Sequence, residues 1–425
     1  MLQRRAFMHR AAVAAAMFGI PVARAERLFA DDVPLPPREL FATDPERYWA
    51  ELRRQWLLAS DRINLNCGSI GCTPLPVLRA TIDHMLSAEE FREPGYPWFG
   101  YEENTRIHEL RDAMSAFLGV SRDELAILRN ATEANNAVCN GLDMKPGDEA
   151  ILTDQEHPGC YGCWQQKEAR FGIKLVTVKL PVPPQSSDEI VAIFERAITP
   201  RTRILVFSHI TTSTGTILPV KEISAMARSK GILTHVDGAH AVGQIPFNIR
   251  DLGCDFYASS PHKWLMSPKG TGLLYVREPL QRQLWVNVVS GGWKDYDSKA
   301  YRFENLGTSN LSVMVGLKAA LDFFATIGAD RIYARIRQHS KRVHDVVASH
   351  PQLAFANASK DEFYAGLVSF TNTKGDLKNF LAECDKRAIR VAVPAPRIRI
   401  ATHIFTQPTE ISAFADALDA GLRAS

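Results

Sequence analysis

The chain has 425 residues, of which 46% are hydrophobic and 23% are charged, a composition typical of a globular protein. Its formal net charge is +3. Residues 1–25 carry four arginines and no acidic residue, so the remaining residues sum to −1 (+3 minus +4). This balance leaves no basic stripe of the kind that nucleic-acid-binding proteins use, and we expect no nucleic-acid partner. The length favours two packed domains with a large core.

The first 25 residues, MLQRRAFMHRAAVAAAMFGIPVARA, have the features of an export signal. An arginine pair and Phe7 precede an uncharged run from Ala11 to Val22, and Ala23-Arg24-Ala25 offers a small-x-small cleavage site. The run is too short to span a bilayer. The segment resembles a twin-arginine signal, so we predict a signal peptide, a periplasmic location and no stable membrane span after processing. A basic N-terminal arm or an uncleaved anchor is the alternative.

Seven cysteines do not make a disulfide framework in a chain of this length. Cys160 and Cys163 form a C-x-x-C pair, which suits a redox pair or half of a metal site. No second C-x-x-C or close histidine pair completes a zinc site, so we predict no metal. We interpret these cysteines as structural, and an oxidising compartment leaves a disulfide open.

Short apolar runs and helix-like segments alternate along most of the chain. Residues 26–60 contain a Pro-rich stretch and then PERYWAELRRQWLLA, which predicts a helix. From about residue 105, apolar runs alternate with segments such as DEIVAIFERAIT and VKEISAMARSKG. Seven runs are expected to be strands: residues 125–128, 150–153, 174–180, 204–208, 233–237, 255–258 and 272–276. Short apolar runs separated by helices predict a mostly parallel sheet buried on both faces.

The pattern changes after Gly307. A long helix over NLSVMVGLKAALDFFATIG is followed by further helix and the apolar runs AGLVSF and AIRVAV, which indicate a smaller α+β domain. The predicted fold is therefore α/β, with a large domain over residues 76–305 built on a seven-stranded sheet. A small C-terminal domain covers residues 306–425, and an N-terminal arm over residues 26–75 packs on it.

Polar groups follow the carboxyl ends of the predicted strands, where open α/β sheets bind ligands. They are a helix start at Ala131 and Thr132, His157 after Glu156, the hydroxyl-rich loop ITTSTG, Asp237, and Ser260-Pro261-His262-Lys263. Pyridoxal phosphate (PLP) requires such a set: an amine for its aldehyde, a carboxylate for its ring nitrogen, donors for its phosphate and a flat group for its ring. Each residue alone is explained as a helix cap or surface polar group; the ordered set predicts a PLP site.

Three motifs carry a resemblance to a known family. SSPHKWLMSPKGTG, THVDGAHAVGQ and ATEANN are similar to the lysine, aspartate and phosphate-binding motifs of the class V aminotransferases, which are PLP enzymes of fold type I. The similarity extends from NLNCGSIG to RIRIATHIFTQPTEI, nearly all of the chain after the signal. It implies that Lys263 is the Schiff-base lysine, that Asp237 pairs with the pyridinium nitrogen and that His157 stacks on the ring.

The resemblance also implies the remaining contacts. Four residues match phosphate ligands: Ala131, Thr132, Ser260 and His262. Thr212 and His240 match positions beside the ring hydroxyl. Thr308 in ENLGTSN matches a residue that reaches the phosphate of the neighbouring subunit, which implies a homodimer with shared active sites.

The substrate end of the site is implied in the same way. Arg399 resembles the arginine that binds the substrate carboxylate, with Arg397 a weaker candidate, and Asn66 is a further candidate for substrate binding. Cys67 is expected near the substrate. The aromatic residues Tyr96, Trp98 and Tyr101 line either the substrate pocket or an interface or core.

Epimerisation, transamination and elimination share this machinery. NLNCGSIGCTP, GYPWFGYEE, EHPGCYGCW and SHITTSTGTILPV resemble the isopenicillin N epimerase-like subgroup, which predicts chemistry at the Cα of an amino acid or amino-acid-derived substrate through an external aldimine and a quinonoid. The loop that carries a desulfurase's nucleophilic cysteine before Arg399 is missing, and Cys384 lies in the helix-like NFLAECDKRA. An aminotransferase, or a C–S lyase without a catalytic cysteine, is the alternative. An inactive scaffold is disfavoured because Lys263 and Asp237 are both present.

Overall fold

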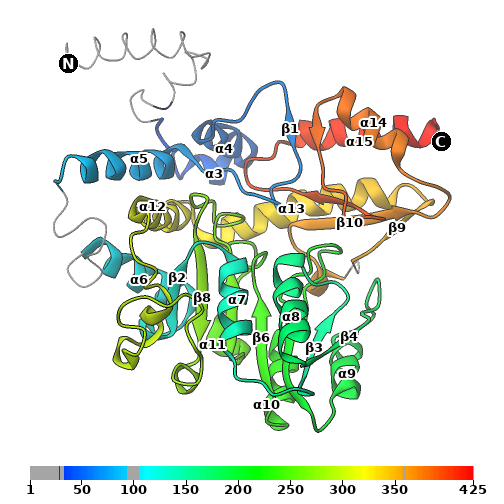
Figure 1. Cartoon of the computed structure of the whole chain (residues 1–425). Helices are drawn as coiled ribbons and strands as arrows, with labels where there is room; N and C mark the ends of the chain where they lie inside the picture. Colours follow the sequence, from blue (N-terminus) through cyan, green and yellow to red (C-terminus); the bar gives the residue numbers. More distant parts are fainter. Residues whose placement is uncertain (1–27, 29–32, 93–104, 358–359, 425) are drawn as a thin grey trace.

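The computed structural model describes residues 28, 33–92, 105–357 and 360–424 (Figure 1). The predicted α/β fold is confirmed. The central sheet has seven strands in the order β2-β8-β7-β6-β5-β3-β4. The strands are β2 (Leu125–Leu128), β3 (Glu149–Thr153), β4 (Lys174–Val178), β5 (Thr202–Ser208), β6 (Leu233–Asp237), β7 (Phe256–Ser259) and β8 (Gly272–Val276). All seven predicted strands exist, and their ends differ from prediction by at most two residues.

Strands β4, β3, β5, β6 and β7 are parallel, and β8 is antiparallel to both β7 and β2. The register places Ser208 beside Asp237 and Asp237 beside Ala258. The carboxyl ends of β5, β6 and β7 therefore lie level at one edge of the sheet, which is where a parallel sheet binds its ligand.

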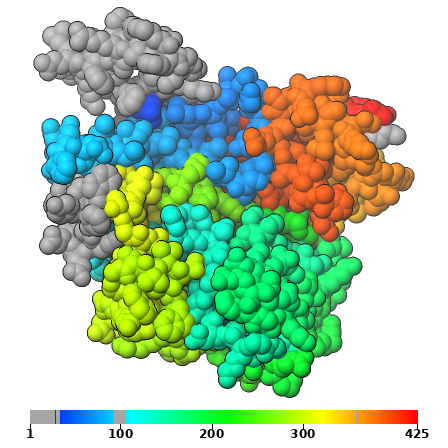
Figure 2. All heavy atoms as spheres, in the orientation of Figure 1, coloured from blue at the N-terminus to red at the C-terminus, as the bar shows by residue number. Residues whose placement is uncertain are grey.

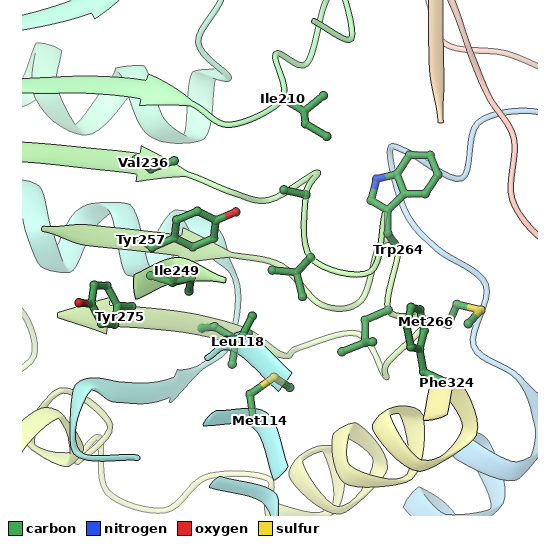
Figure 3. Packing of buried hydrophobic residues seen from close by; sticks show 14 of the residues in the cluster. Met114, Leu118, Ile210, Val236, Ile249, Tyr257, Trp264, Met266, Tyr275 and Phe324 are labelled. Atoms are coloured by element: carbon green, nitrogen blue, oxygen red, sulfur yellow. The ribbon is translucent and has the colours of Figure 1, made fainter. Parts of the chain in front are cut away.

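The apolar strands are explained by two cores, one on each face of the sheet. In β5, Leu205 and Phe207 belong to one buried cluster, whereas Ile204 and Val206 belong to the other. This is the alternation that a strand imposes on its side chains. Figure 3 shows Tyr257 and Tyr275 from neighbouring strands in the first cluster, together with residues of a flanking helix. Burial on both faces removes the apolar–polar alternation of a one-sided sheet.

Helices cover both faces of the sheet. One cluster is shared with α7 (Ala131–Gly141) and α8 (Pro158–Phe171), the other with α6 (Thr105–Leu118), α9 (Ser187–Ala197) and α10 (Val220–Ser229). The short helix α11 (Ile249–Leu252) and the 3₁₀ helices η2 (Arg122–Glu124), η3 (Glu278–Leu280) and η4 (Tyr296–Phe303) complete this part. In Figure 1, α7 and α8 lie in front of the strands.

The C-terminal part has its own sheet and core. Strands β9 (Leu353–Phe355), β10 (Leu367–Asn372) and β12 (Ile398–Ala401) form an antiparallel sheet in the order β12-β10-β9. A third buried cluster lies between this sheet and the helices α13 (Ala329–Ala348), α14 (Lys378–Lys386) and α15 (Pro408–Arg423). The 3₁₀ helix η5 (Asp361–Phe363) precedes β10.

The N-terminal arm joins this C-terminal part. Strand β1 (Ile63–Asn64) pairs in parallel with β11 (Ile389–Arg390), and Figure 2 shows the blue N-terminal residues directly against the orange C-terminal ones. The arm also contains α3 (Leu40–Thr43), α4 (Pro45–Leu52) and η1 (Arg53–Gln55). Helices α5 (Leu75–Glu89) and α12 (Leu311–Ile327), which begin near the predicted domain boundaries, pack on each other.

Two predictions fall outside the described residues: the signal segment 1–25 and the aromatic residues Tyr96, Trp98 and Tyr101. Within the described part of the chain, no single helix is long and apolar enough to cross a membrane. Helices α12 and α13 reach that length and composition only as a pair, and the pair is bent by 82°.

Candidate active site

A cavity of about 360 Å³ lies at the carboxyl ends of the central strands. Nine of the predicted site residues line it: Ala131, Thr132, His157, Thr212, Asp237, His240, Ser260, His262 and Lys263. Three others, Asn66, Thr308 and Arg399, are not part of its wall. The sequence therefore predicted which strand ends converge.

One end of the cavity is built for an anion. The N-terminus of α7 begins here, capped by Asn130, whose side chain accepts the backbone N–H of Glu133 at 2.9 Å. The backbone N–H of Ala131 donates to Oγ of Ser260 at 2.9 Å, which ties the helix start to the loop after β7. Free N–H groups and hydroxyls at a helix N-terminus favour a phosphate.

His262 lies at the same end. Its Nδ1 is 2.9 Å from the carbonyl oxygen of Thr271, and because a carbonyl only accepts, Nδ1 carries a proton and Nε2 is the nitrogen available to a ligand. Burial lowers the pKa of His262, while the bond to Thr271 raises it. A bound phosphate would favour the doubly protonated ring.

Asp237 is the buried carboxylate of the cavity. Its Oδ1 accepts the backbone N–H of Ala239 at 3.0 Å, and its Oδ2 accepts Nδ2 of Asn135 at 3.0 Å. Both bonds fix the orientation of the carboxyl group. Such a group suits the nitrogen of a pyridinium ring.

The Lys263 amine lies 3.4 Å from Nε2 of His240. Burial lowers the pKa of Lys263 to about 8, with Asp237 acting in the opposite direction. The ring of His240 is oriented by Trp264, whose Nε1–H donates to Nδ1 at 3.3 Å. Burial and the neighbouring Lys263 hold the pKa of His240 well below its usual range, so this ring is neutral. A lysine with a lowered pKa is a better nucleophile towards an aldehyde.

His157 is the N-cap of α8. Its Nδ1 accepts the backbone N–H of Gly159 at 2.9 Å, so in the neutral ring the proton is on Nε2. Burial and Lys263 lower the pKa of His157, which favours that neutral ring. A Cβ at position 159 would come within 2.6 Å of Thr132 Oγ1, so the close approach of α8 to α7 requires glycine here.

Arg399 lies one layer behind the cavity wall. Its Nη1 donates to the carbonyl oxygen of Thr212 at 2.7 Å, and its Nη2 donates to Ser69 Oγ at 2.9 Å and Asn66 Oδ1 at 3.2 Å. Ser69 and Thr212 do line the cavity. Within the described residues Arg399 has no acidic partner, and its buried Nε has no hydrogen bond. The guanidinium is therefore a buried charge to which a substrate carboxylate can pair.

Thr308 lines a second cavity of about 410 Å³. Arg129, Lys269 and Gly270 are shared by the walls of both cavities, so the two adjoin. Thr308 thus lies near the cofactor end of the site without entering its wall.

Sequence reasoning missed several wall residues, including Asn135, Ser208 and Lys269. Asn135 follows Thr132 by three positions on α7, and this spacing places both on one helix face, a signal that was readable. Ser208 and Lys269 carried no comparable signal.

The residues present fit PLP. The cavity combines an anion-binding helix start, a carboxylate fixed by two donors, a flat imidazole and an amine of lowered pKa, and two buried polar atoms beside it, Arg399 Nε and Asn135 Oδ1, have no partner among the described residues. No cluster of three or more metal-ligating side chains occurs in that part of the chain.

Comparisons with known proteins identify the family of the chain. The family described as aminotransferase class-V matches residues 73–396, and the chain belongs to that family. The chain is 32% identical over 394 residues to the isopenicillin N epimerase of Streptomyces clavuligerus, which covers 88% of this chain and 98% of that protein. It is 27% identical over 397 residues to a probable cysteine desulfurase of Methanothermobacter thermautotrophicus, covering 87% and 97%.

A solved structure of C-DES with glycine covalently linked to its PLP cofactor has a TM-score of 0.75. It is 27% identical, covering 87% of this chain and 99% of that chain. The prediction of a PLP-dependent class V enzyme similar to isopenicillin N epimerases is confirmed.

Proposed function

We propose that this protein is an isopenicillin N epimerase-like enzyme that moves the proton at the Cα of an amino acid or amino-acid-derived substrate. The observation that carries the proposal is that the Lys263 amine and the Asp237 carboxylate line one cavity, with the Arg399 guanidinium, which has no acidic partner among the described residues, directly behind its wall residues Ser69 and Thr212. PLP, when bound, supplies an electron sink that acidifies the substrate Cα–H bond.

The predicted site residues have distinct roles in this chemistry. Ala131, Thr132, Ser260 and His262 would hold the phosphate, and Asp237 would hold the ring nitrogen. Arg399 binds the substrate carboxylate once its Nη2 exchanges Ser69 for the ligand. This places the Cα near Lys263, whose amine removes the proton.

Inversion requires a second proton carrier. The neutral ring of His157 does not supply it, because loss of the Nε2 proton from a neutral imidazole would leave an imidazolate anion. A group on the face of the cofactor opposite Lys263 must therefore carry that proton.

The cysteines favour epimerisation over persulfide chemistry. The loop between β11 and β12, residues 391–397, contains no cysteine. Cys384 is buried in the core against α15, and burial raises its pKa. Cys67 is buried, its Sγ lies 3.2 Å from the carbonyl oxygen of Ala401, and its pKa is raised well above the usual range. Neither thiol is poised as a nucleophile.

A C–S lyase or aminotransferase is the second candidate. A solved structure of the cystine C–S lyase C-DES with cysteine persulfide is 27% identical to this chain, with a TM-score of 0.74. Elimination without a catalytic cysteine uses the same lysine and the same carboxylate site.

The deciding experiment uses purified mature protein with PLP, L-amino acids and small peptides in deuterated buffer. We expect Cα proton exchange with inversion, and no keto acid or sulfide. Keto acid or sulfide without inversion would assign the protein to the transferase or lyase branch.

Two further proposals accompany this function. We propose a homodimer in which Thr308 serves the partner's cofactor, supported by the cavity that Thr308 lines beside the cofactor cavity. We also propose export to the periplasm by the twin-arginine route, supported by the sequence of residues 1–25. The N-terminal sequence of the mature protein tests the second proposal.

A further inference from the structure

Asn135 contacts the carboxylate that faces the cofactor ring. It lies in the second turn of α7 and is 1% exposed, and its Nδ2 donates to Oδ2 of Asp237 at 3.0 Å. The other carboxylate oxygen of Asp237 is held by the backbone N–H of Ala239. The amide of Asn135 is therefore the side-chain donor that fixes Asp237 among the described residues.

We propose that Asn135 is a positioning residue that holds the Asp237 carboxylate in the correct orientation for the ring nitrogen of the cofactor. The physical reason is the charge-assisted hydrogen bond. A donor to a carboxylate stabilises its ionised form more than its protonated form. The proton shared between Asp237 and the pyridine nitrogen is thereby shifted towards the nitrogen, which strengthens the electron sink.

Folding alone does not explain an asparagine at this position. Its neighbours on the buried face of α7, Ala134, Ala137 and Val138, are apolar. Its Oδ1 is buried and has no partner among the described residues, which costs free energy. An apolar side chain such as alanine or leucine would avoid that cost. The side chain of Asn135 lines the ligand cavity, so contact with the ligand explains why this position is polar.

Several other titratable groups interact with Asp237 and contribute to any pH dependence. They are Glu156, His157, Cys160, His235, Tyr257 and Lys263. Lys263 is the group to which the cofactor would be joined, and it is unchanged in every variant. The amide of Asn135 is the contribution that a substitution at position 135 removes.

The test compares Asn135→Leu, Asn135→Ala and wild type, each as full-length protein reconstituted with PLP. Two quantities are measured without turnover: the dissociation constant of PLP for the apo protein, and the midpoint pH of the visible absorbance of the cofactor joined to Lys263. Asn136→Ala is the matched control, because Asn136 is next on the same helix and its amide donates to the Thr132 carbonyl oxygen, not to Asp237. Thermal melting checks that each variant folds. If Asn135→Leu does not fold, the comparison is made with Asn135→Ala alone.

We expect the midpoint pH to rise by about one unit in the Asn135 variants. A ring nitrogen with less positive charge repels the proton on the Lys263–cofactor imine less, so the imine keeps that proton to higher pH. The dissociation constant of PLP should increase about tenfold. Asn136→Ala should match wild type in both quantities. A midpoint within 0.2 units of wild type (about the error of such a titration) with unchanged PLP affinity would overturn the proposal.

The inference rests on the PLP site and not on the reaction. If wild type shows no visible band, the cofactor assignment fails. If wild type shows the band and the variants titrate like it, only the role of Asn135 fails, whichever reaction the enzyme catalyses.

Discussion

The amine of Lys263 and Nε2 of His240 lie 3.4 Å apart at the carboxyl edge of the central sheet. His240 is a neutral neighbour, because Trp264 donates to its Nδ1 and burial lowers its pKa. Lys263 is therefore poorly solvated and, among the described residues, has no acid in direct hydrogen-bond contact, which accounts for a pKa of about 8. An ordinary lysine would be almost fully protonated at neutral pH.

The rate at which apo protein gains PLP should rise with pH through about 8, because only the unprotonated amine attacks the aldehyde. Between pH 7 and 9 the unprotonated fraction increases roughly tenfold. Stopped-flow absorbance at saturating PLP measures this. Lys263→Ala should lose the visible band entirely. A rate that keeps rising about tenfold per pH unit through pH 9, without levelling off, would show that Lys263 has an ordinary pKa.

Much of the fold was predictable because burial on both sides of a parallel sheet is recorded in sequence as short apolar runs. The start of β5 was missed at Thr202 and Arg203, since these residues are polar: Thr202 pairs only with Glu149 of β3, and Arg203 lies at a register shift. The antiparallel direction of β8 depends on strand order, which a single run does not contain.

The site, like the fold, was predictable in part. Strand-end residues such as Asp237 converge because topology brings them together, whereas the contacts of Asn135 and Trp264 depend on side chains meeting across elements. The position of Arg399 behind Ser69 could not be read from spacing, because it depends on how β12 meets the loop after β1.

Arg399→Lys should raise the KM for substrate by roughly 10- to 100-fold, because the point charge of lysine replaces the two-pronged guanidinium donor. The effect on kcat should be smaller, since the carboxylate is bound in both the ground and transition states. Cα proton exchange at varied substrate concentration measures both constants. Arg397→Lys is the matched control and should change KM less than about twofold. An equal increase in KM at both positions would show that Arg399 is not the specific ligand of the substrate carboxylate.

Subunits that share active sites should complement each other. Lys263→Ala and Thr308→Ala subunits, mixed and reassembled at limiting PLP, form heterodimers with one intact site if Thr308 serves the partner's cofactor. Random pairing then restores about a quarter of wild-type activity. If Thr308 serves its own subunit, every site keeps one lesion, and the mixture stays at the average of the two parents.

The thiols should react in two classes. Six of the seven cysteines are buried and Cys72 is half-buried beside a small cavity, next to Lys269. A thiol reagent should therefore modify about one thiol quickly in the native protein and all seven after denaturation. Cys72→Ser should abolish the fast phase. Cys384→Ala should keep activity. A variant that binds PLP but has lost activity would show that Cys384 takes part in the reaction.

Glu156 should make stability depend on pH. Its carboxylate lies between the hydroxyls of Ser208, at 2.6 Å, and Thr153, and burial raises its pKa to about 7. Between pH 4.5, the usual value for this side chain, and pH 7, the unfolded chain ionises this group while the folded protein does not. The free energy of unfolding therefore falls as pH rises through this window, and is constant with respect to Glu156 above it.

Glu156→Gln removes this ionisation, so its stability relative to wild type should improve by about 2 kcal/mol between pH 5 and pH 7.5. Thermal melting of the apo proteins at the two pH values measures the change. The control is Glu195→Gln, a surface carboxylate paired with Lys230 at 3.1 Å, which should show no such trend. While Glu156 is protonated, it does not add a second buried negative charge near Asp237. If Glu156→Gln instead lost stability equally at both pH values, Glu156 would be an ordinary hydrogen-bonding group.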